Sequence, residues 1–411
     1  MVYDYDYGII GGGPAGYTAA MSLAKKGKRV VLFEKNLLGG TCLNRGCIPT
    51  KSLLHSSEIY KNILNSSEYG IEIDIKSFDF SKIAEKRDKI VEKIRKSLEL
   101  AVKNSGAQIV YHEAKAIDSN TITADKEYSV GEIIIATGAE PKEIEGLRFD
   151  GEFILSSDDV LKLNKLPKSV LIIGSGAIGI EWARIFSNFG VEVSILEMAE
   201  HLLPSADIEV SKRLERIFKQ KNVKFYLNDK IAKINNQNIL LQSGHELTID
   251  FVLVAVGRKP INSENNDCNC IGDARGEVQL AHYAIKQGVN LANLETLRLD
   301  KDLIPSVIYG EPEIAWVGLR EQDCDESYKI IVLPITALGK SWCDDSTDGF
   351  IKLIIKEDFI IGAHIISKEA SALIHQILIA MQNKISVTQL RDICFAHPTY
   401  SEGIFEALNR C

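Results

Sequence analysis

Residues 7–16 read YGIIGGGPAG and are followed by a helical pattern and by an apolar strand that ends at Glu34. The glycines between the first strand and the helix have the spacing G-x-G-x-x-G, at Gly11, Gly13 and Gly16. In such a turn the first glycine permits a tight bend, the second lets the backbone approach a pyrophosphate, and the third lets the helix pack on the strand. The carboxylate of Glu34 is placed to accept hydrogen bonds from ribose hydroxyls. The segment predicts a dinucleotide-binding unit, with a bare glycine turn as the alternative interpretation.

The same pattern returns at residues 169–179, which read SVLIIGSGAIG. Its glycines, Gly174, Gly176 and Gly179, precede Glu197 by the spacing that separates the first three glycines from Glu34. Two copies indicate two dinucleotides, as in a protein where a flavin exchanges electrons with a nicotinamide. No Arg or Lys occurs in the three residues after Glu197. Because this carboxylate would repel a 2′-phosphate, the second unit is expected to prefer NAD over NADP.

Each unit closes with an apolar run, at 132–137 and 250–256, of the kind that forms buried parallel strands. Residues 270–274 predict a return to the first sheet, which makes the second unit an insertion in the first. From residue 304 onward, short strand candidates precede helical patterns at 370–381 and 388–393. The sequence thus predicts an α/β protein with two Rossmann-like dinucleotide-binding domains and a C-terminal α+β domain.

Composition excludes several classes of protein. The 411 residues are 45% hydrophobic and 25% charged, with a net charge of -8. These proportions are typical of a globular chain, and the negative charge gives nucleic acid or an anionic membrane surface no electrostatic attraction. The chain starts with acidic residues and has no apolar run long enough to cross a bilayer. We expect a soluble, cytoplasmic protein whose eight cysteines are mostly reduced.

Two of those cysteines lie close together, in residues 39–51, which read GGTCLNRGCIPTK. A helical pattern follows, so Cys42 and Cys47 are predicted near a helix start, where the helix dipole favours a thiolate. The alternatives are unrelated structural thiols, half of a metal site and a static disulfide. A metal site would need further Cys or His residues at ligand spacing, which the chain does not offer, so we expect no metal. A redox-active disulfide is the favoured interpretation.

This stretch resembles the active-site signature of the flavoprotein disulfide reductases, in the form typical of dihydrolipoamide dehydrogenases. The similarity runs nearly from end to end, and it includes residues 272–274 (GDA), 280–282 (LAH), 304–309 (IPSVIY) and 397–402 (HPTYSE). The resemblance implies an FAD domain over 1–145 and 263–300, an inserted NAD domain over 146–262, and a C-terminal dimerisation domain over 301–411.

The resemblance also implies a role for individual residues. Cys42 would exchange with a dithiol substrate, and Cys47 would lie against the flavin. His397, held in one tautomer by Glu402, would act as the base at the partner subunit's disulfide. Two further residues, Lys51 and Glu181, would pair beside the flavin. Additional cofactor contacts are expected at Thr137, Gly138, Gly257, Asp273 and Ala281.

The implied activity is that of a homodimeric dihydrolipoamide dehydrogenase, which would use FAD and NAD and act on the lipoyl domain of a 2-oxo acid dehydrogenase or glycine cleavage complex. A glutathione-type or mercuric-type reductase is a rival, as is a shortened, non-enzymatic relative. The chain departs from the family between Pro260 and Gly272, where only 11 residues intervene. The last strand of the first sheet must then come from residues 267–270, which have poor strand propensity. We therefore expect Asp273, and with it FAD binding, to depend on an unusually short strand.

Overall fold

The computed structural model describes residues 3–261, 269–293 and 300–410. Its N-terminal sheet is mainly parallel, and the glycine turn leads from its central strand into α1 (Pro14–Lys25). Two short antiparallel strands, β5 (Thr121–Thr123) and β4 (Lys115–Ala116), extend the sheet beside β6. The parallel strands are, in spatial order, β3 (Gln108–Val110), β2 (Val30–Phe33), β1 (Tyr5–Ile10), β6 (Glu127–Ile135) and β17 (Asn269–Cys270).

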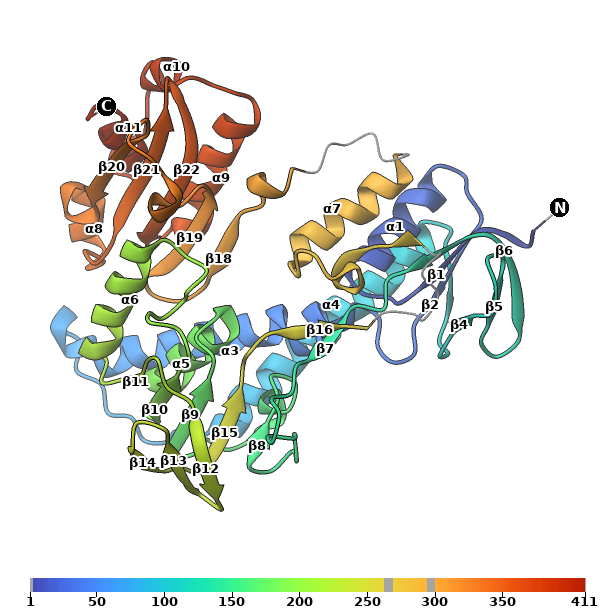
Figure 1. Cartoon of the computed structure of the whole chain (residues 1–411), viewed down its shortest axis with the longest axis horizontal. Coiled ribbons are helices and arrows are strands. Elements are labelled where there is room, and N and C mark those ends of the chain that lie inside the picture. The colour runs from blue at the N-terminus through green and yellow to red at the C-terminus, as the bar shows by residue number, and fades with distance from the viewer. Residues whose placement is uncertain (1–2, 262–268, 294–299, 411) are drawn as a thin grey trace.

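The second sheet repeats this order with five parallel strands (Figure 1). Helices α5 (Ala177–Asn188) and α6 (Ile208–Gln220) connect its strands. The strands are β11 (Lys224–Tyr226), β10 (Glu192–Leu196), β9 (Ser169–Ile173), β15 (Phe251–Val254) and β8 (Ile154–Leu155). A small antiparallel sheet adjoins it, formed by β12 (Ile231–Asn235), β13 (Asn238–Leu241) and β14 (Glu246–Thr248).

The chain enters and leaves the second sheet through a pair of antiparallel strands, β7 (Ala139–Pro141) and β16 (Arg258–Pro260). It then rejoins the first sheet, where β17 pairs with the end of β6 and the N–H of Ile271 donates to Ile135 at 2.9 Å. The predicted return of the chain to the first sheet is therefore formed by two residues, Asn269 and Cys270, which pair with β6. Asp267 and Cys268, which we expected in the same strand, lie outside the described residues.

Helices pack on one face of the first sheet, where their buried side chains form one apolar cluster with residues of the strands. The close approach of α1 and α7 (Ala281–Ala292) depends on Gly288, where an added Cβ would lie 2.6 Å from the carbonyl oxygen of Ala15. Between β2 and β3 the chain forms α2 (Gly40–Arg45), α3 (Cys47–Leu64) and the long α4 (Phe80–Asn104). This connection carries the cysteine pair.

The C-terminal sheet is antiparallel, and two of its strands, β18 and β22, lie outside the short strand candidates of the sequence. The apolar face of α9 (Ala370–Gln382) packs on this domain's core. Smaller helices complete the domain: α8 (Gly339–Cys343), α10 (Val387–Arg391) and α11 (Glu402–Leu408). The strand order is β18 (Ser306–Ile308), β19 (Glu313–Gly318), β22 (Phe359–Ser367), β21 (Phe350–Lys356) and β20 (Lys329–Pro334).

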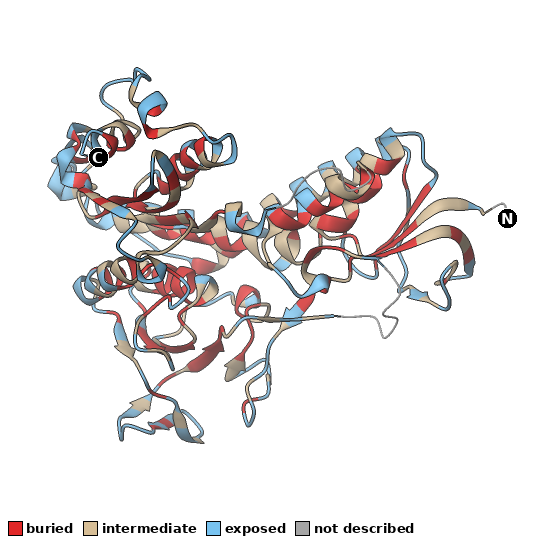
Figure 2. Ribbon diagram, turned by 45° about the horizontal axis from the view of Figure 1, so that its top comes forward, coloured by how far each residue is buried: buried red, intermediate tan, exposed pale blue. Residues whose placement is uncertain are grey.

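Buried residues are concentrated in the strands and in the helix faces that cover them (Figure 2). One apolar cluster joins the second sheet to the C-terminal domain, since it contains Ile172 and Leu214 together with Ile314, Phe350 and Ile366. These two domains therefore share a core. Among the described residues, no helix combines the length and the hydrophobicity that a bilayer-spanning segment needs.

Candidate active site

The two cysteines lie on either side of a tight turn between α2 and α3. Cys42 belongs to α2, and Cys47 is the first residue of α3, so the predicted position at a helix start is correct for Cys47. Both are free thiols and half-buried. Between them, Gly46 leaves little space, because an added Cβ would lie 3.0 Å from the carbonyl oxygen of Thr41 and 3.4 Å from the Cα of Cys42.

A hydrogen bond gives the two thiols different acidities. The Cys42 thiol donates to Cys47, and this bond, helped by the ammonium of Lys51 against the effect of burial, lowers the pKa of Cys47 to about 7. The same bond, together with burial, raises the pKa of Cys42 well above its ordinary value. Above about pH 7 the pair therefore holds mainly one thiolate, on Cys47, and one proton, on Cys42.

Lys51 lies one helical turn after Cys47 and is held by a buried acid from the second domain. Its Nζ is 2.8 and 2.7 Å from the two carboxylate oxygens of Glu181, on α5. Burial alone would lower the pKa of Lys51, but Glu181 raises it above its ordinary value. The structure thus brings together the two residues that the resemblance paired, and it keeps a positive charge beside Cys47.

The sequence did not indicate two other residues of this cluster. The ring of Tyr309 lies 4.8 Å from Lys51 Nζ, and the Tyr309 N–H donates to Glu181 at 3.2 Å. Arg184, which is fully buried, donates to the carbonyl oxygen of Tyr309 at 2.7 Å. Tyr309 ends the segment 304–309, which contributes to the family resemblance but implied no role for this residue. For Arg184 the available signal was a charged residue within an apolar helix.

The first glycine turn has the backbone geometry that its sequence predicted. Gly11 has a φ of 111°, and an added Cβ would lie 2.2 Å from the carbonyl oxygen of Ala136. At Gly16 an added Cβ would lie 1.9 Å from the carbonyl oxygen of Gly11, so only glycine allows α1 to start this close to the strand. Glu34 accepts hydrogen bonds from the N–H groups of Gly12 (2.9 Å) and Asn36 (2.8 Å).

The second turn repeats these contacts. Gly174 has a φ of 97°, and an added Cβ at Gly179 would lie 2.0 Å from the carbonyl oxygen of Gly174. Glu197 accepts from the N–H of Ser175 at 2.8 Å and from its hydroxyl at 2.7 Å. The hydroxyl is the difference between the two turns, since Gly12 occupies the corresponding place in the first. Gly13 and Gly176 cap their helices without a side-chain hydrogen bond, which leaves first-turn N–H groups of both helices for an anion.

Asp273 lies beside the first turn. An added Cβ at Gly272 would lie 2.8 Å from the Cβ of Ala15, which places this segment against the start of α1. Burial raises the pKa of Asp273, and among the described residues none donates a hydrogen bond to its carboxylate. Asp273 is half-buried, so its carboxylate is open to donors from outside the chain, and the hydroxyl groups of a dinucleotide would supply them. Amide donors, acidic acceptors and the space left by the glycines therefore fit a bound dinucleotide.

The remaining predicted cofactor residues lie at the edges of this site. The hydroxyl of Thr137 donates to the carbonyl oxygen of Ile261 at 2.5 Å, so it already has a partner within the chain. Gly138 and Gly257 have φ values of 79° and 98°, and they mark the entry to and the exit from the second domain. Ala281 is the first residue of α7, whose start also lacks a side-chain cap.

His397 and Glu402 form a pair in the C-terminal domain. His397 Nδ1 lies 2.7 Å from a Glu402 oxygen, and the N–H of Thr399 donates to the other oxygen at 2.8 Å. Burial alone would raise the pKa of Glu402, but these two hydrogen bonds hold it below its ordinary value. The ionised carboxylate keeps the proton of the imidazole on Nδ1, so Nε2 is left as an acceptor.

The His397 side chain is 77% exposed, and among the described residues no interaction links it to either cysteine of its own chain.

Residues 5–286 match the family described as pyridine nucleotide-disulphide oxidoreductase, and residues 304–408 match the dimerisation domain of that family. The chain belongs to the pyridine nucleotide-disulphide oxidoreductase family. Its dimerisation domain indicates a homodimer, and members of the family bind FAD and NAD(P).

Relatives in this family match the whole chain. A dihydrolipoyl dehydrogenase of Bacillus subtilis (strain 168) is 32% identical over 99% of this chain and 98% of its own. The mitochondrial dihydrolipoyl dehydrogenase of Pisum sativum is 33% identical over 98% of this chain and 90% of its own. A leghemoglobin reductase of Vigna unguiculata is 31% identical over 98% of this chain and 86% of its own.

Solved structures of the family share the fold. LpdA of Mycobacterium tuberculosis has a TM-score of 0.91 at 23% identity, and covers 98% of this chain and 99% of its own. The Cu(II) complex of RclA, an HOCl-induced flavoprotein disulfide reductase of Escherichia coli, has a TM-score of 0.86 at 25% identity and covers 100% of both chains. The protein is a flavoprotein disulfide oxidoreductase, and the names of its relatives describe different activities.

Proposed function

We propose that this flavoprotein is a dihydrolipoamide dehydrogenase, which oxidises protein-bound dihydrolipoamide with NAD+. The observation that carries the proposal is the Cys42–Cys47 turn, in which one thiol keeps its proton and the other is a thiolate beside Lys51. Such an asymmetric pair supports thiol–disulfide exchange with a dithiol, because the cysteine with the lower pKa is the better leaving group. The curated dihydrolipoyl dehydrogenases that are 32% and 33% identical to this chain support the lipoyl substrate over glutathione or mercuric ion.

Both cofactors have residues that would hold them. Gly11, Gly13 and Gly16, with Glu34 and Asp273, would bind FAD in the first domain, and Gly174 to Glu197 would bind NAD in the second. When bound, FAD would accept an electron pair from the dithiol form of the protein and supply it to NAD+ as a hydride. The short segment before Gly272 still forms β17 and brings Asp273 to the start of α1, which favours an FAD-binding enzyme over a non-enzymatic relative.

The protein's own residues would carry out a thiol–disulfide exchange. His397 of the partner subunit would take a proton from one thiol of the substrate, and the resulting thiolate would attack the sulfur of Cys42 in the Cys42–Cys47 disulfide. That bond breaks, a mixed disulfide forms, and Cys47 leaves as a thiolate. The second substrate thiol then attacks the substrate sulfur in the mixed disulfide. It closes the lipoyl disulfide, and Cys42 leaves and takes up a proton. Two electrons pass from the substrate to the cysteine pair.

Steady-state assays on the purified, FAD-loaded protein test this proposal. We expect NADH formation from dihydrolipoamide and NAD+ at a rate at least ten times that with NADP+, and at least ten times that of NADPH oxidation by glutathione disulfide or mercuric ion. Cys42→Ser should abolish the lipoyl reaction, while Cys343→Ser, at an exposed cysteine of α8, serves as the matched control and should retain it. Faster turnover of glutathione disulfide than of the lipoyl substrate would refute the assignment.

A further inference from the structure

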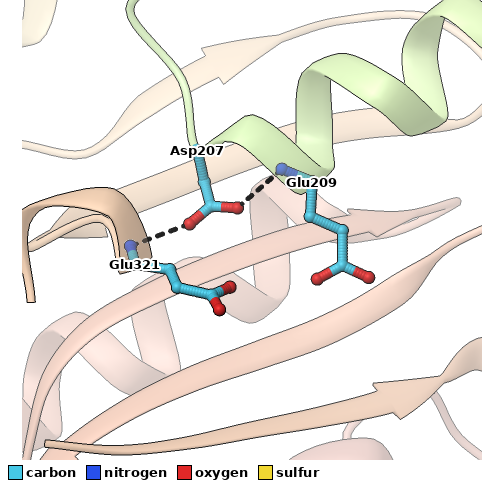
Figure 3. A group of neighbouring side chains, drawn as sticks. All are labelled: Asp207, Glu209 and Glu321. Carbon is cyan, nitrogen blue, oxygen red and sulfur yellow. Dashed lines mark hydrogen bonds between the residues drawn. The ribbon is translucent and has the colours of Figure 1, made fainter. Parts of the chain in front are cut away.

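Three carboxylates from two domains meet around one buried ammonium group. Asp207, Glu209 and Glu321 have carboxylate oxygens within 4.8 Å of one another (Figure 3). The Nζ of Lys352 lies 2.7 Å from Asp207, 2.9 Å from Glu209 and 2.5 Å from Glu321. The side chains of Lys352 and Asp207 are both 0% exposed. The ammonium therefore occupies the place where a bound cation would have to lie.

This cluster joins α6 of the second domain to the C-terminal domain. Asp207 caps the start of α6: one of its oxygens accepts from the N–H of Glu209 at 2.9 Å, and the other accepts from the N–H of Glu321 at 2.9 Å (Figure 3). The side chain of Gln322 also bonds the backbone at positions 206 and 208. Lys352 comes from β21 and supplies the positive charge that lets the acidic groups of the two domains approach one another.

A short segment connects the cluster to the second glycine turn. Four residues before Asp207, the N–H of buried Leu203 donates to the hydroxyl of Ser175 at 3.1 Å, and that hydroxyl donates to Glu197 at 2.7 Å. Leu203 has a φ of 55°, which a residue with a branched side chain keeps only where its surroundings hold it. Ser211 of α6 donates to the Leu203 carbonyl at 3.3 Å. The segment is thus fixed to Glu197 at one end and to Lys352 at the other.

We propose that Lys352 is a positioning residue for the NAD site, because it holds the start of α6 and thereby keeps Leu203, Ser175 and Glu197 in place for the ribose hydroxyls. The proposal rests on the proposed function, which assigns Glu197 to NAD. Burial alone would lower the pKa of Lys352, but the carboxylates raise it, so the ammonium is charged at neutral pH. Without it, three carboxylates would repel one another, and α6 would shift together with Leu203.

Lys352→Met in the full-length protein tests the coupling, with NADH binding measured by isothermal titration calorimetry on protein reduced beforehand, so that NADH binds without transferring electrons. We expect the Kd for NADH to rise at least tenfold, while the rate of Cys47 alkylation by iodoacetamide stays within twofold of wild type. Arg213→Met is the matched control. It removes an ion pair between α6 and Asp348 of the C-terminal domain (3.3 Å) that does not involve Leu203, so the Kd should stay within twofold.

Further variants separate the possible outcomes. Adding Glu209→Gln and Glu321→Gln to Lys352→Met removes two of the repelling charges and should recover part of the NADH affinity. No recovery would contradict positioning by charge.

The Glu197→Ala variant separates the coupling from the proposed function. If Glu197→Ala loses NADH affinity but a folded Lys352→Met binds NADH as wild type does, the coupling is wrong and the proposed function stands. If Glu197→Ala binds normally, the assignment of Glu197 fails and the coupling fails with it. Should Lys352→Met not fold, Asp207→Asn is expected to raise the Kd at least threefold, and an unchanged Kd would overturn the proposal.

Discussion

Cys42 and Cys47 look equivalent in the sequence, but their surroundings give them different charges. The spacing of the pair and the helix that follows it predicted a reactive thiol, and the resemblance to the family was needed to say which cysteine does what. The physical difference comes from the hydrogen bond donated by Cys42 and from Lys51, which Glu181 holds one turn further along α3. Glu181, 130 positions from Lys51, thus holds the cation that favours the Cys47 thiolate, and no local pattern could predict this contact.

This acidity can be measured by alkylation. Because the pKa of Cys47 is lowered to about 7, its thiolate predominates above pH 7 and is lost below it. In the reduced protein, the rate of iodoacetamide labelling of the Cys47 peptide, followed by mass spectrometry, should be half-maximal near pH 7. An ordinary thiol titrates near about 8.5.

Lys51→Met should move the half-maximal pH upward, since the positive charge that favours the thiolate is removed. Lys61→Met, at an ordinary position on the same helix, is the control and should leave the profile unchanged. A Cys47 profile that does not respond to the loss of Lys51 would contradict the electrostatic explanation.

The two strand–turn–helix elements were the most predictable part of the fold, because glycine spacing reflects contacts within the element itself. The contact that requires the third glycine recurs at 1.9 Å in the first turn and 2.0 Å in the second. Other elements depend on distant partners. Residues 269 and 270 form a strand because β6 offers a free edge, despite their poor strand propensity. Lys352, a charge inside an apolar strand, is accommodated by acids from another domain.

Gly179→Ala tests the second element alone. Its Cβ would meet a backbone oxygen that cannot move aside, so we expect a loss of about 1–3 kcal/mol in the free energy of unfolding and weaker NADH binding, with FAD retained. Urea unfolding, NADH titration and the flavin absorbance measure the three quantities. Gly339→Ala, where nothing lies within 4 Å of the added Cβ, should change stability by less than about 0.5 kcal/mol. An alanine at 179 that binds NADH as tightly as glycine would show that the turn does not approach the cofactor.

At the scale of the whole molecule, the chain presents two halves of an active site that do not meet. The cysteines lie between the first two domains, whereas His397 is 77% exposed on the C-terminal domain. The sequence predicted the His397–Glu402 pair through the family resemblance, and the structure shows the pair formed at 2.7 Å. Its relation to the cysteines depends on a second subunit, which a single sequence does not describe. The central claim is that each complete site contains the cysteines of one subunit and His397 of the other.

Subunit complementation tests this claim most directly. Cys42→Ser and His397→Ala chains, coexpressed with different affinity tags and purified as the heterodimer, would combine both lesions at one site and leave the other site intact. We expect the heterodimer to oxidise dihydrolipoamide at about half the wild-type rate per dimer, whereas a mixture of the two purified homodimers should stay near the low rate of His397→Ala alone. A verified heterodimer that shows no recovery would contradict the account, because His397 would then act within its own chain or would not be the base.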